Sequence, residues 1–188
     1  MAENGLKISV EESYSLGTSD FSQLSEQLRS NRIDAFYVAG PSSEAARIVR
    51  QSRQVGLAAQ LISGSILGAT EFDRISGGTA DGTLMISSID PRLLPEAKTV
   101  VETFKKNGFE PEGYTLYAYA AVQSWAQAVQ SAGTDEPARV ADALHKIGSV
   151  DTVAGRIAFD ERGDVRNPRM GVYQFRDGGF RLVEEIKI

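Results

Sequence analysis

Apolar and polar positions in the first ninety residues follow two periods in turn. Short apolar runs, typical of buried strands, alternate with segments whose apolar residues recur every three or four positions, as on one face of a helix. The predicted strands are 7–10, 34–39, 59–62 and 82–88, and the predicted helices are 21–31, 43–55 and 71–76. Strands that alternate with helices of these lengths indicate βαβ units, a parallel sheet and right-handed crossovers.

The pattern changes at Asp90-Pro91, because proline lacks the N–H that a sheet ladder needs and restricts the residue before it. Three successive helices are predicted after this point, at 94–107, 114–132 and 137–147. The helix at 114–132 is expected to turn one apolar line inward, made of Tyr117, Ala121, Trp125 and Ala128. Helices without intervening strands do not extend a βαβ sheet simply, so they predict a second unit.

The last thirty-four residues return to β-structure. Strands are predicted at 155–160, 170–175 and 180–184. The last two are separated by Asp177-Gly178, and Asp-Gly between alternating apolar runs is a strong hairpin signal.

Composition and charge exclude several classes of function. The 188 residues are 41% hydrophobic with a formal net charge of −5, which is typical of a globular protein and argues against a nucleic-acid surface. No apolar run approaches the roughly 20 residues of a membrane helix, and MAENGLKISV lacks the pattern of a signal peptide. The chain contains no cysteine, so disulfides, thiolate metal sites and cysteine nucleophiles are absent.

The stretch AFYVAGPSSEAARIVRQ predicts a strand that passes directly into a helix. Such a turn places backbone N–H groups and the positive end of a helix dipole at a sheet edge, where ligands of α/β proteins bind. A phosphate-binding loop would need several glycines and a Lys followed by Ser or Thr. This turn has only Gly40, then Pro41, and Glu44 would repel an anion. Ser42 or Ser43 is therefore expected to cap the helix.

The commonest catalytic and nucleotide-binding signatures do not occur, so an enzyme would have to rest on carboxylates alone. His145 is predicted to lie on the polar side of a helix, exposed to solvent. Asp160, Glu161 and Asp164 form the best acidic cluster, but they lack the spacing of a calcium loop. We interpret them as a turn between strands, and no metal site is predicted.

Aromatic residues recur at near-helical spacing between Tyr114 and Trp125, with Tyr117 and Tyr119 between them. Such a stripe more often packs in a core than forms a ligand cage, so a core stripe is predicted. One or two aromatic residues at its N-terminal end remain candidates for a cleft.

Five segments of the chain resemble a known family, in sequence and in order. They are EESYSLGTSDFSQLSEQLRSNRIDAFYVAG, SEAARIVRQSRQVGL, GGTADGTLMISSIDP, YAYAAVQSWAQAV and VDTVAGRIAFDERGDVRNPRMGVYQF. The chain resembles, over nearly all of its length, the C-terminal part of branched-chain-amino-acid-type solute-binding proteins of ABC importers, also called type I periplasmic binding proteins.

This resemblance implies an α/β fold with a flavodoxin-like parallel sheet lobe, a helical part of a second lobe and a C-terminal hairpin. The corresponding divisions would be 5–90, 91–166 and 167–188. It also implies a small molecule held in a cleft between lobes, a permease as partner of the complete protein and a periplasmic location. No catalytic residue and no cofactor are expected.

The resemblance places the ligand at a small set of positions. These are Gly40, Pro41, Ser42, Ser63, Ser65 and Tyr114. The amino-acid binders present an aromatic residue where this chain has Pro41, and an acidic residue for the ligand ammonium where it has Ser65. Serine supplies no charge to a desolvated ammonium, so an uncharged or anionic ligand is expected, such as an aromatic or aliphatic carboxylate.

The family begins with a full lobe that these 188 residues lack. Helices without their sheet would expose apolar faces, which pairing of two chains would cover. A homodimer is therefore expected. Two other functions are weighed against a transport-type binding module: a ligand-sensing regulator of the same fold, which binds a protein partner, and a small carboxylate enzyme.

Overall fold

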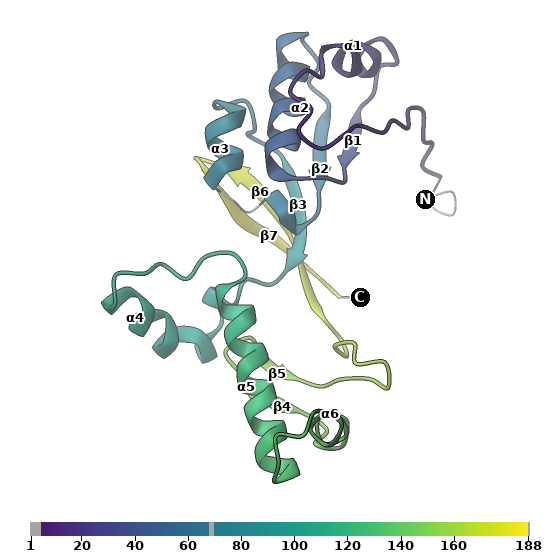
Figure 1. Ribbon diagram of the computed structural model, residues 1–188. Helices are drawn as coiled ribbons and strands as arrows, with labels where there is room; N and C mark the ends of the chain where they lie inside the picture. The colour runs from purple at the N-terminus through teal and green to yellow at the C-terminus, as the bar shows by residue number, and fades with distance from the viewer. Residues whose placement is uncertain (1–4, 68–69, 188) are drawn as a thin grey trace. The chain divides into compact units, whose positions relative to one another are not determined.

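The structure is a computed structural model that describes residues 5–67 and 70–187. The chain forms two compact units (Figure 1). Unit 1 contains the described residues of 1–87 and 170–186, and unit 2 contains those of 88–169 together with 187. The lobe boundaries expected at 90 and 166 concern a complete binding protein and stay predictions.

Unit 1 is built on a five-stranded mixed sheet in the order β1-β2-β3-β6-β7. The strands are β1 (Ala35–Val38), β2 (Gln60–Ser63), β3 (Leu84–Ser88), β6 (Arg169–Arg176) and β7 (Gly179–Lys187). The first three are parallel, with Val38 opposite Ser63 and Ser63 opposite Met85. This confirms the predicted α/β class.

The C-terminal strands continue this sheet as the sequence predicts. The Thr83 carbonyl accepts a hydrogen bond from the Phe175 N–H, and the Arg169 carbonyl accepts one from the Ile89 N–H, so β6 runs antiparallel to β3. Asp177 and Gly178 both have positive φ, of 50° and 75°, as a two-residue hairpin turn requires. The predicted hairpin is confirmed.

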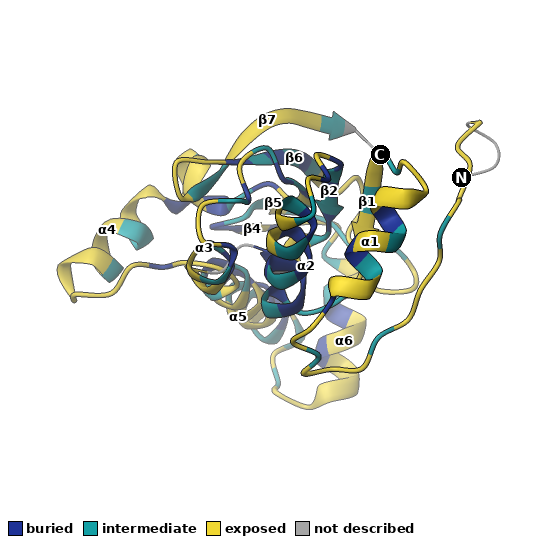
Figure 2. Ribbon diagram, turned by 90° about the horizontal axis from the view of Figure 1, so that it is seen from above, coloured by how far each residue is buried: buried dark blue, intermediate teal, exposed yellow. Residues whose placement is uncertain are grey.

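Three helices lie along one side of this sheet (Figures 1 and 2). They are α1 (Ser22–Ser30), α2 (Ser42–Gln54) and α3 (Thr70–Ser76). Ile48 and Val49 of α2 are fully buried with Leu61 of β2 and Phe72 of α3. Phe72 meets the ring of Phe175 on β6 edge-on at 5.5 Å, which ties the helical layer to the sheet.

The predicted strand at 7–10 is wrong. These residues form no β-ladder in the described chain, and Leu6 and Ile8 are 65% and 60% exposed. A strand is stable only beside a partner that pairs its N–H and C=O groups. The β-branched and apolar side chains of this segment indicate a strand, but local propensity cannot supply the partner.

Unit 2 combines helices with a small hairpin. Its elements are two 3-10 turns, η3 (Pro91–Leu93) and η4 (Pro95–Ala97), the helices α4 (Lys98–Lys106), α5 (Thr115–Ala132) and α6 (Pro137–Lys146), and the strands β4 (Val150–Thr152) and β5 (Gly155–Ile157). The helix predicted at 94–107 begins later, because Pro95 opens a separate 3-10 turn. The strand predicted at 155–160 ends at Ile157, and it pairs antiparallel with β4, which was not predicted.

The inward face of α5 differs from the prediction. Its buried residues are Leu116, Ala120, Ser124 and Ala128. Trp125, expected to point inward, is 54% exposed. The buried line is displaced by one position along most of the helix, and its Leu116 and Ala120 pack in one cluster with Ala97 and Val153. Both lines border a groove described below.

Candidate functional site

Five of the six predicted ligand residues meet at one edge of the unit 1 sheet. β1 and β2 are parallel and in register, so their carboxyl ends are neighbours. The turn with Gly40 and Pro41 follows β1, and Ser65 follows Ser63, the last residue of β2. The Ser63 hydroxyl donates to the Val38 carbonyl at 2.7 Å, which fastens the two strand ends together. Ligands of α/β proteins bind beyond this edge of a sheet. We call it the carboxyl edge.

The prediction that Ser42 caps α2 is wrong. The helix begins at Ser42 itself, and the residue before it, Pro41, occupies the N-cap position without a side-chain capping bond. The Ser42 side chain is 6% exposed, and its hydroxyl has no hydrogen-bond partner among the described atoms. The chain enters the helix one residue early because proline is compatible with the extended backbone of an N-cap, here with φ −58° and ψ 155°.

Tyr14 belongs to this edge, although the sequence reasoning did not select it. A Cβ atom placed on Gly40 would lie 1.9 Å from the Tyr14 hydroxyl oxygen, so the phenol packs directly on the glycine. The ring also meets Phe21 edge-on at 5.3 Å. The hydroxyl is buried and has no partner among the described atoms. No local sequence signal marks Tyr14, because it contacts a residue more than twenty-five positions away.

A buried carboxylate, that of Glu44, lies in the first helical turn after Gly40 and Pro41. Glu44, in the first turn of α2, is 3% exposed and accepts a hydrogen bond from the Gly17 N–H at 2.8 Å. The Ser43 hydroxyl donates to its other oxygen. The Ser43 hydroxyl, followed by the Gly17 N–H, lowers the pKa of Glu44 below its usual range. Burial, and then the negative charge of Glu44, raise the pKa of Tyr14.

The sixth predicted ligand residue, Tyr114, lies in unit 2 at the N-terminus of α5 and is 69% exposed. Tyr119 and Trp125 are 39% and 54% exposed, so the predicted core stripe is wrong for these three. Tyr117 is half-buried, and its hydroxyl donates to the Ile89 carbonyl at 2.8 Å. The stripe fails because α5 turns Leu116 and a line of small residues, rather than its aromatic ones, to the interior.

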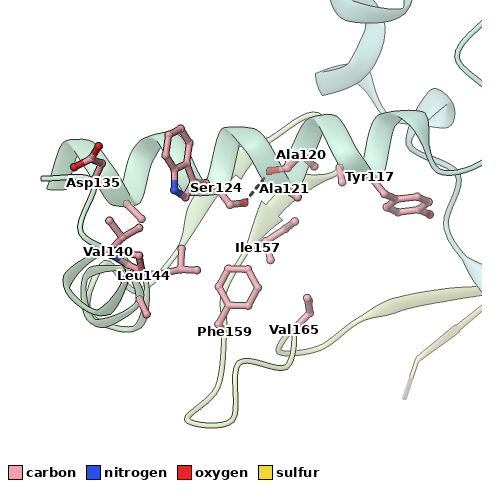
Figure 3. Close-up of a pocket in the computed structure, with 15 residues that line it drawn as sticks. Tyr117, Ala120, Ala121, Ser124, Asp135, Val140, Leu144, Ile157, Phe159 and Val165 are labelled. Atoms are coloured by element: carbon pink, nitrogen blue, oxygen red, sulfur yellow. Dashed lines mark hydrogen bonds between the residues drawn. The ribbon is translucent and has the colours of Figure 1, made fainter. Parts of the chain in front are cut away.

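An apolar groove of about 580 Å³ lies within unit 2, between α5, α6 and the segment that follows β5 (Figure 3). Its walls include Tyr117, Ala121 and Trp125 of α5, Val140 and Leu144 of α6, and Phe159. Among the described residues that line it, Asp135 alone carries a charge. The line of α5 that was predicted to face a core borders this groove, together with Ala120, Ser124 and Ala128 of the buried line.

The acidic cluster at 160–164 forms the predicted turn. The Asp160 carboxylate accepts the N–H groups of Arg162 and Asp164 at 2.8 and 2.9 Å. The Asp164 N–H is the main cause that lowers the pKa of Asp160. His145 is exposed, as predicted. Within residues 5–67 and 70–187, no three His, Asp or Glu side chains are grouped as a metal site would require.

The mixed sheet with helices along one side defines the class as an α/β lobe of the periplasmic-binding-protein type. A family model described as "Periplasmic binding protein" matches residues 1–179, and the chain belongs to this family. The resemblance to the C-terminal portion of a type I periplasmic binding protein is thereby confirmed.

Individual relatives and structures agree with this assignment. The chain is 40% identical over 186 residues to Leu/Ile/Val-binding protein homolog 1 of Brucella suis, covering 97% of this chain and 50% of the relative. It is 40% identical to an amino acid binding protein of Pseudomonas aeruginosa, covering 93% and 47%. The structure of a leucine binding protein from Thermotoga maritima matches with a TM-score of 0.83 and 28% identity, covering 92% and 50%. The chain thus spans about half the length of the relatives it matches.

In the part of the chain that the structure describes, no helix combines the length and the apolar character needed to cross a bilayer.

Proposed function

We propose that the chain is the C-terminal part of the substrate-binding component of an ABC-type importer, and that its carboxyl edge forms one wall of the ligand cleft. The ligand class is a small amino acid or an aromatic or aliphatic carboxylate. The convergence of Gly40, Pro41, Ser42, Ser63 and Ser65 on neighbouring parallel strands carries this proposal. The names of the relatives, which include binding proteins for leucine, isoleucine and valine, support it.

Uncovered apolar faces support a larger assembly. Tyr37, Ile62 and Leu84 lie side by side on the sheet face opposite Val38, and Ile86 follows on the same face. Tyr37 and Ile86 are 59% and 39% exposed, whereas parallel sheets normally have both faces covered. In a complete binding protein, the remaining half of the relatives' length would cover this face and the groove. The complete protein would lie in the periplasm and deliver its ligand to a permease.

The 188-residue chain studied alone is proposed to form a homodimer, because pairing removes the same apolar faces from water. Native mass spectrometry of the purified chain at micromolar concentration measures this directly. A dimer mass, with or without a retained small molecule, is expected. A monomer mass contradicts the pairing.

Ligand binding is tested by isothermal titration of the 188-residue chain with leucine, isoleucine, valine and benzoate. Saturable heat with at least one of these compounds is expected, and no binding by any of them contradicts the proposal for this chain. Ser65→Asp places a carboxylate in the η2 turn (Ser65–Leu67), so it should shift preference toward cationic ligands such as leucinamide. Ser149→Asp makes the same charge change in an exposed loop of unit 2 and should leave selectivity unchanged. Unchanged selectivity in Ser65→Asp as well would remove Ser65 from the site.

A further inference from the structure

Glu44 occupies the third helical position of α2, where a glutamate normally completes a capping box by accepting the N–H of the N-cap residue. Here the N-cap residue is Pro41, which has no N–H to donate. The carboxylate instead accepts the N–H of Gly17, twenty-seven residues earlier in the chain. Because the N-cap residue is proline, Glu44 makes a long-range hydrogen bond with Gly17 in place of a local capping bond.

The hydrogen bond from Gly17 to Glu44 holds a second turn, residues 15–18, against the carboxyl edge. Thr18 closes that turn by donating its N–H and its hydroxyl to the Ser15 carbonyl, at 3.2 and 2.6 Å. Gly17 stands within it at φ 83°, in the left-handed region that favours glycine. Tyr14 precedes the turn and packs on Gly40. Glu44 thereby holds the phenol of Tyr14 against the same turn that carries three of the predicted ligand residues.

The negative charge of Glu44 also lies at the positive N-terminal end of the α2 dipole. The first N–H groups of a helix attract an anion, and a carboxylate in the first turn satisfies them from within the protein. Glu44 is 3% exposed, and the cation of Arg47 also helps to keep its carboxylate charged. The Tyr14 phenol, which packs on Gly40, has its pKa raised first by burial and then by the negative charge of Glu44, so Glu44 lies close enough to this turn to act on it.

We propose that Glu44 determines the charge preference of the carboxyl edge: the ligand presents a neutral or cationic group to the Gly40 turn, and an anionic group is disfavoured there. This inference rests on the proposed function of the edge as a ligand wall. It changes the expectation drawn from Ser65, because Glu44 supplies the carboxylate that Ser65 does not. The ligand class narrows to compounds that carry an ammonium or a neutral polar group at this end, as amino acids do.

Three probes share the side chain of leucine and differ only in the charged groups that they carry. Leucine is zwitterionic, leucinamide is cationic and 4-methylpentanoate is anionic. Their dissociation constants are measured by isothermal titration on the 188-residue chain, on Glu44→Gln and on Glu71→Gln. The amide that Glu44→Gln introduces retains an oxygen that can accept the Gly17 N–H. Glu71 is exposed in the first turn of α3 and makes a matched charge control. Leucinamide should bind about tenfold more tightly than 4-methylpentanoate to the unchanged chain and to Glu71→Gln, and Glu44→Gln should reduce the ratio to about threefold or less.

Binding with an unchanged ratio in Glu44→Gln overturns the inference and leaves the proposed function intact. If no probe binds any of the three proteins, the proposed function fails for this chain, and a ligand-free measurement decides the role of Glu44. Titration of the Tyr14 phenol by its ultraviolet absorbance, with Tyr14→Phe to identify its signal, should then show a lower pKa in Glu44→Gln. An unchanged phenol pKa would show that the charge does not reach the edge, and would overturn the inference.

Discussion

Replacing Gly40 by alanine tests whether the carboxyl edge is packed as described. The added Cβ would lie 1.9 Å from the hydroxyl oxygen of Tyr14 and 3.0 Å from its Cζ atom, whereas ordinary contacts begin near 3.4 Å. The phenol must therefore move, together with its edge-on contact with Phe21. Overpacking of this kind costs about 1–3 kcal/mol in free energy of unfolding.

A double-mutant cycle with Tyr14→Phe separates the clash from other effects of the new methyl group. The phenylalanine removes the closest atom and leaves only the 3.0 Å contact, which a displacement of a few tenths of an ångström relieves. Because the tyrosine hydroxyl is buried without a described partner, Tyr14→Phe alone should be neutral or stabilise by up to about 1 kcal/mol. In the Tyr14→Phe background, Gly40→Ala should cost less than half of what it costs in the unchanged protein.

Native-state hydrogen exchange of the α2 amides, measured with increasing urea, gives the free energy of opening of unit 1 for the four proteins. Exchange of the α5 amides in unit 2 is the internal control and should not change. A loss below about 0.5 kcal/mol in Gly40→Ala, or a loss of equal size in both backgrounds, would refute the packing of Tyr14 on Gly40.

Three further predictions concern other parts of the chain. Because the folded-state pKa of Glu44 lies below its ordinary value of 4.5, the stability that it contributes should be fully present above pH 4.5 and should decline as pH falls through the folded-state pKa; hydrogen exchange of unit 1 against pH checks this, and Glu44→Gln should weaken the dependence, while Asp20, whose pKa is also lowered, keeps part of it. Ser63→Ala removes the donor to the buried Val38 carbonyl and should cost about 1 kcal/mol in urea unfolding; no loss would mean that the carbonyl is satisfied otherwise. Trp125→Glu in the groove wall should leave a monomer mass, whereas Val122→Glu, 63% exposed on the same helix and outside the groove, should remain dimeric.

The elements of unit 1 were predictable because each has its own pattern. The apolar run ending in Val38 and the inward line through Ile48 and Val49 both follow from periodicity, and the Asp177-Gly178 turn follows from its need for positive φ. These signals are local, and tertiary contacts reinforce them. The strand predicted at 7–10 failed because pairing depends on a neighbour, which no local pattern reports.

The candidate site was predictable only as a location. Parallel strands fix where Gly40 and Ser63 meet, whereas the contacts of their side chains depend on packing over long separations. The approach of Tyr14 to Gly40 and the bond from Gly17 to Glu44 each join residues more than twenty-five positions apart. Neither leaves a spacing signal. The inward face of α5 was misassigned for a related reason, since two apolar lines run along this helix and only packing distinguishes them.

Trp125 has a further consequence, because it is the only tryptophan in the chain and it stands half-exposed in the groove wall. Indole emission moves to shorter wavelength when water is removed from around the ring. The fluorescence of Trp125 therefore reports whether a second chain covers the groove. Dilution of an associated sample should shift its emission to the red, and the midpoint of that shift gives the strength of the association without any added label.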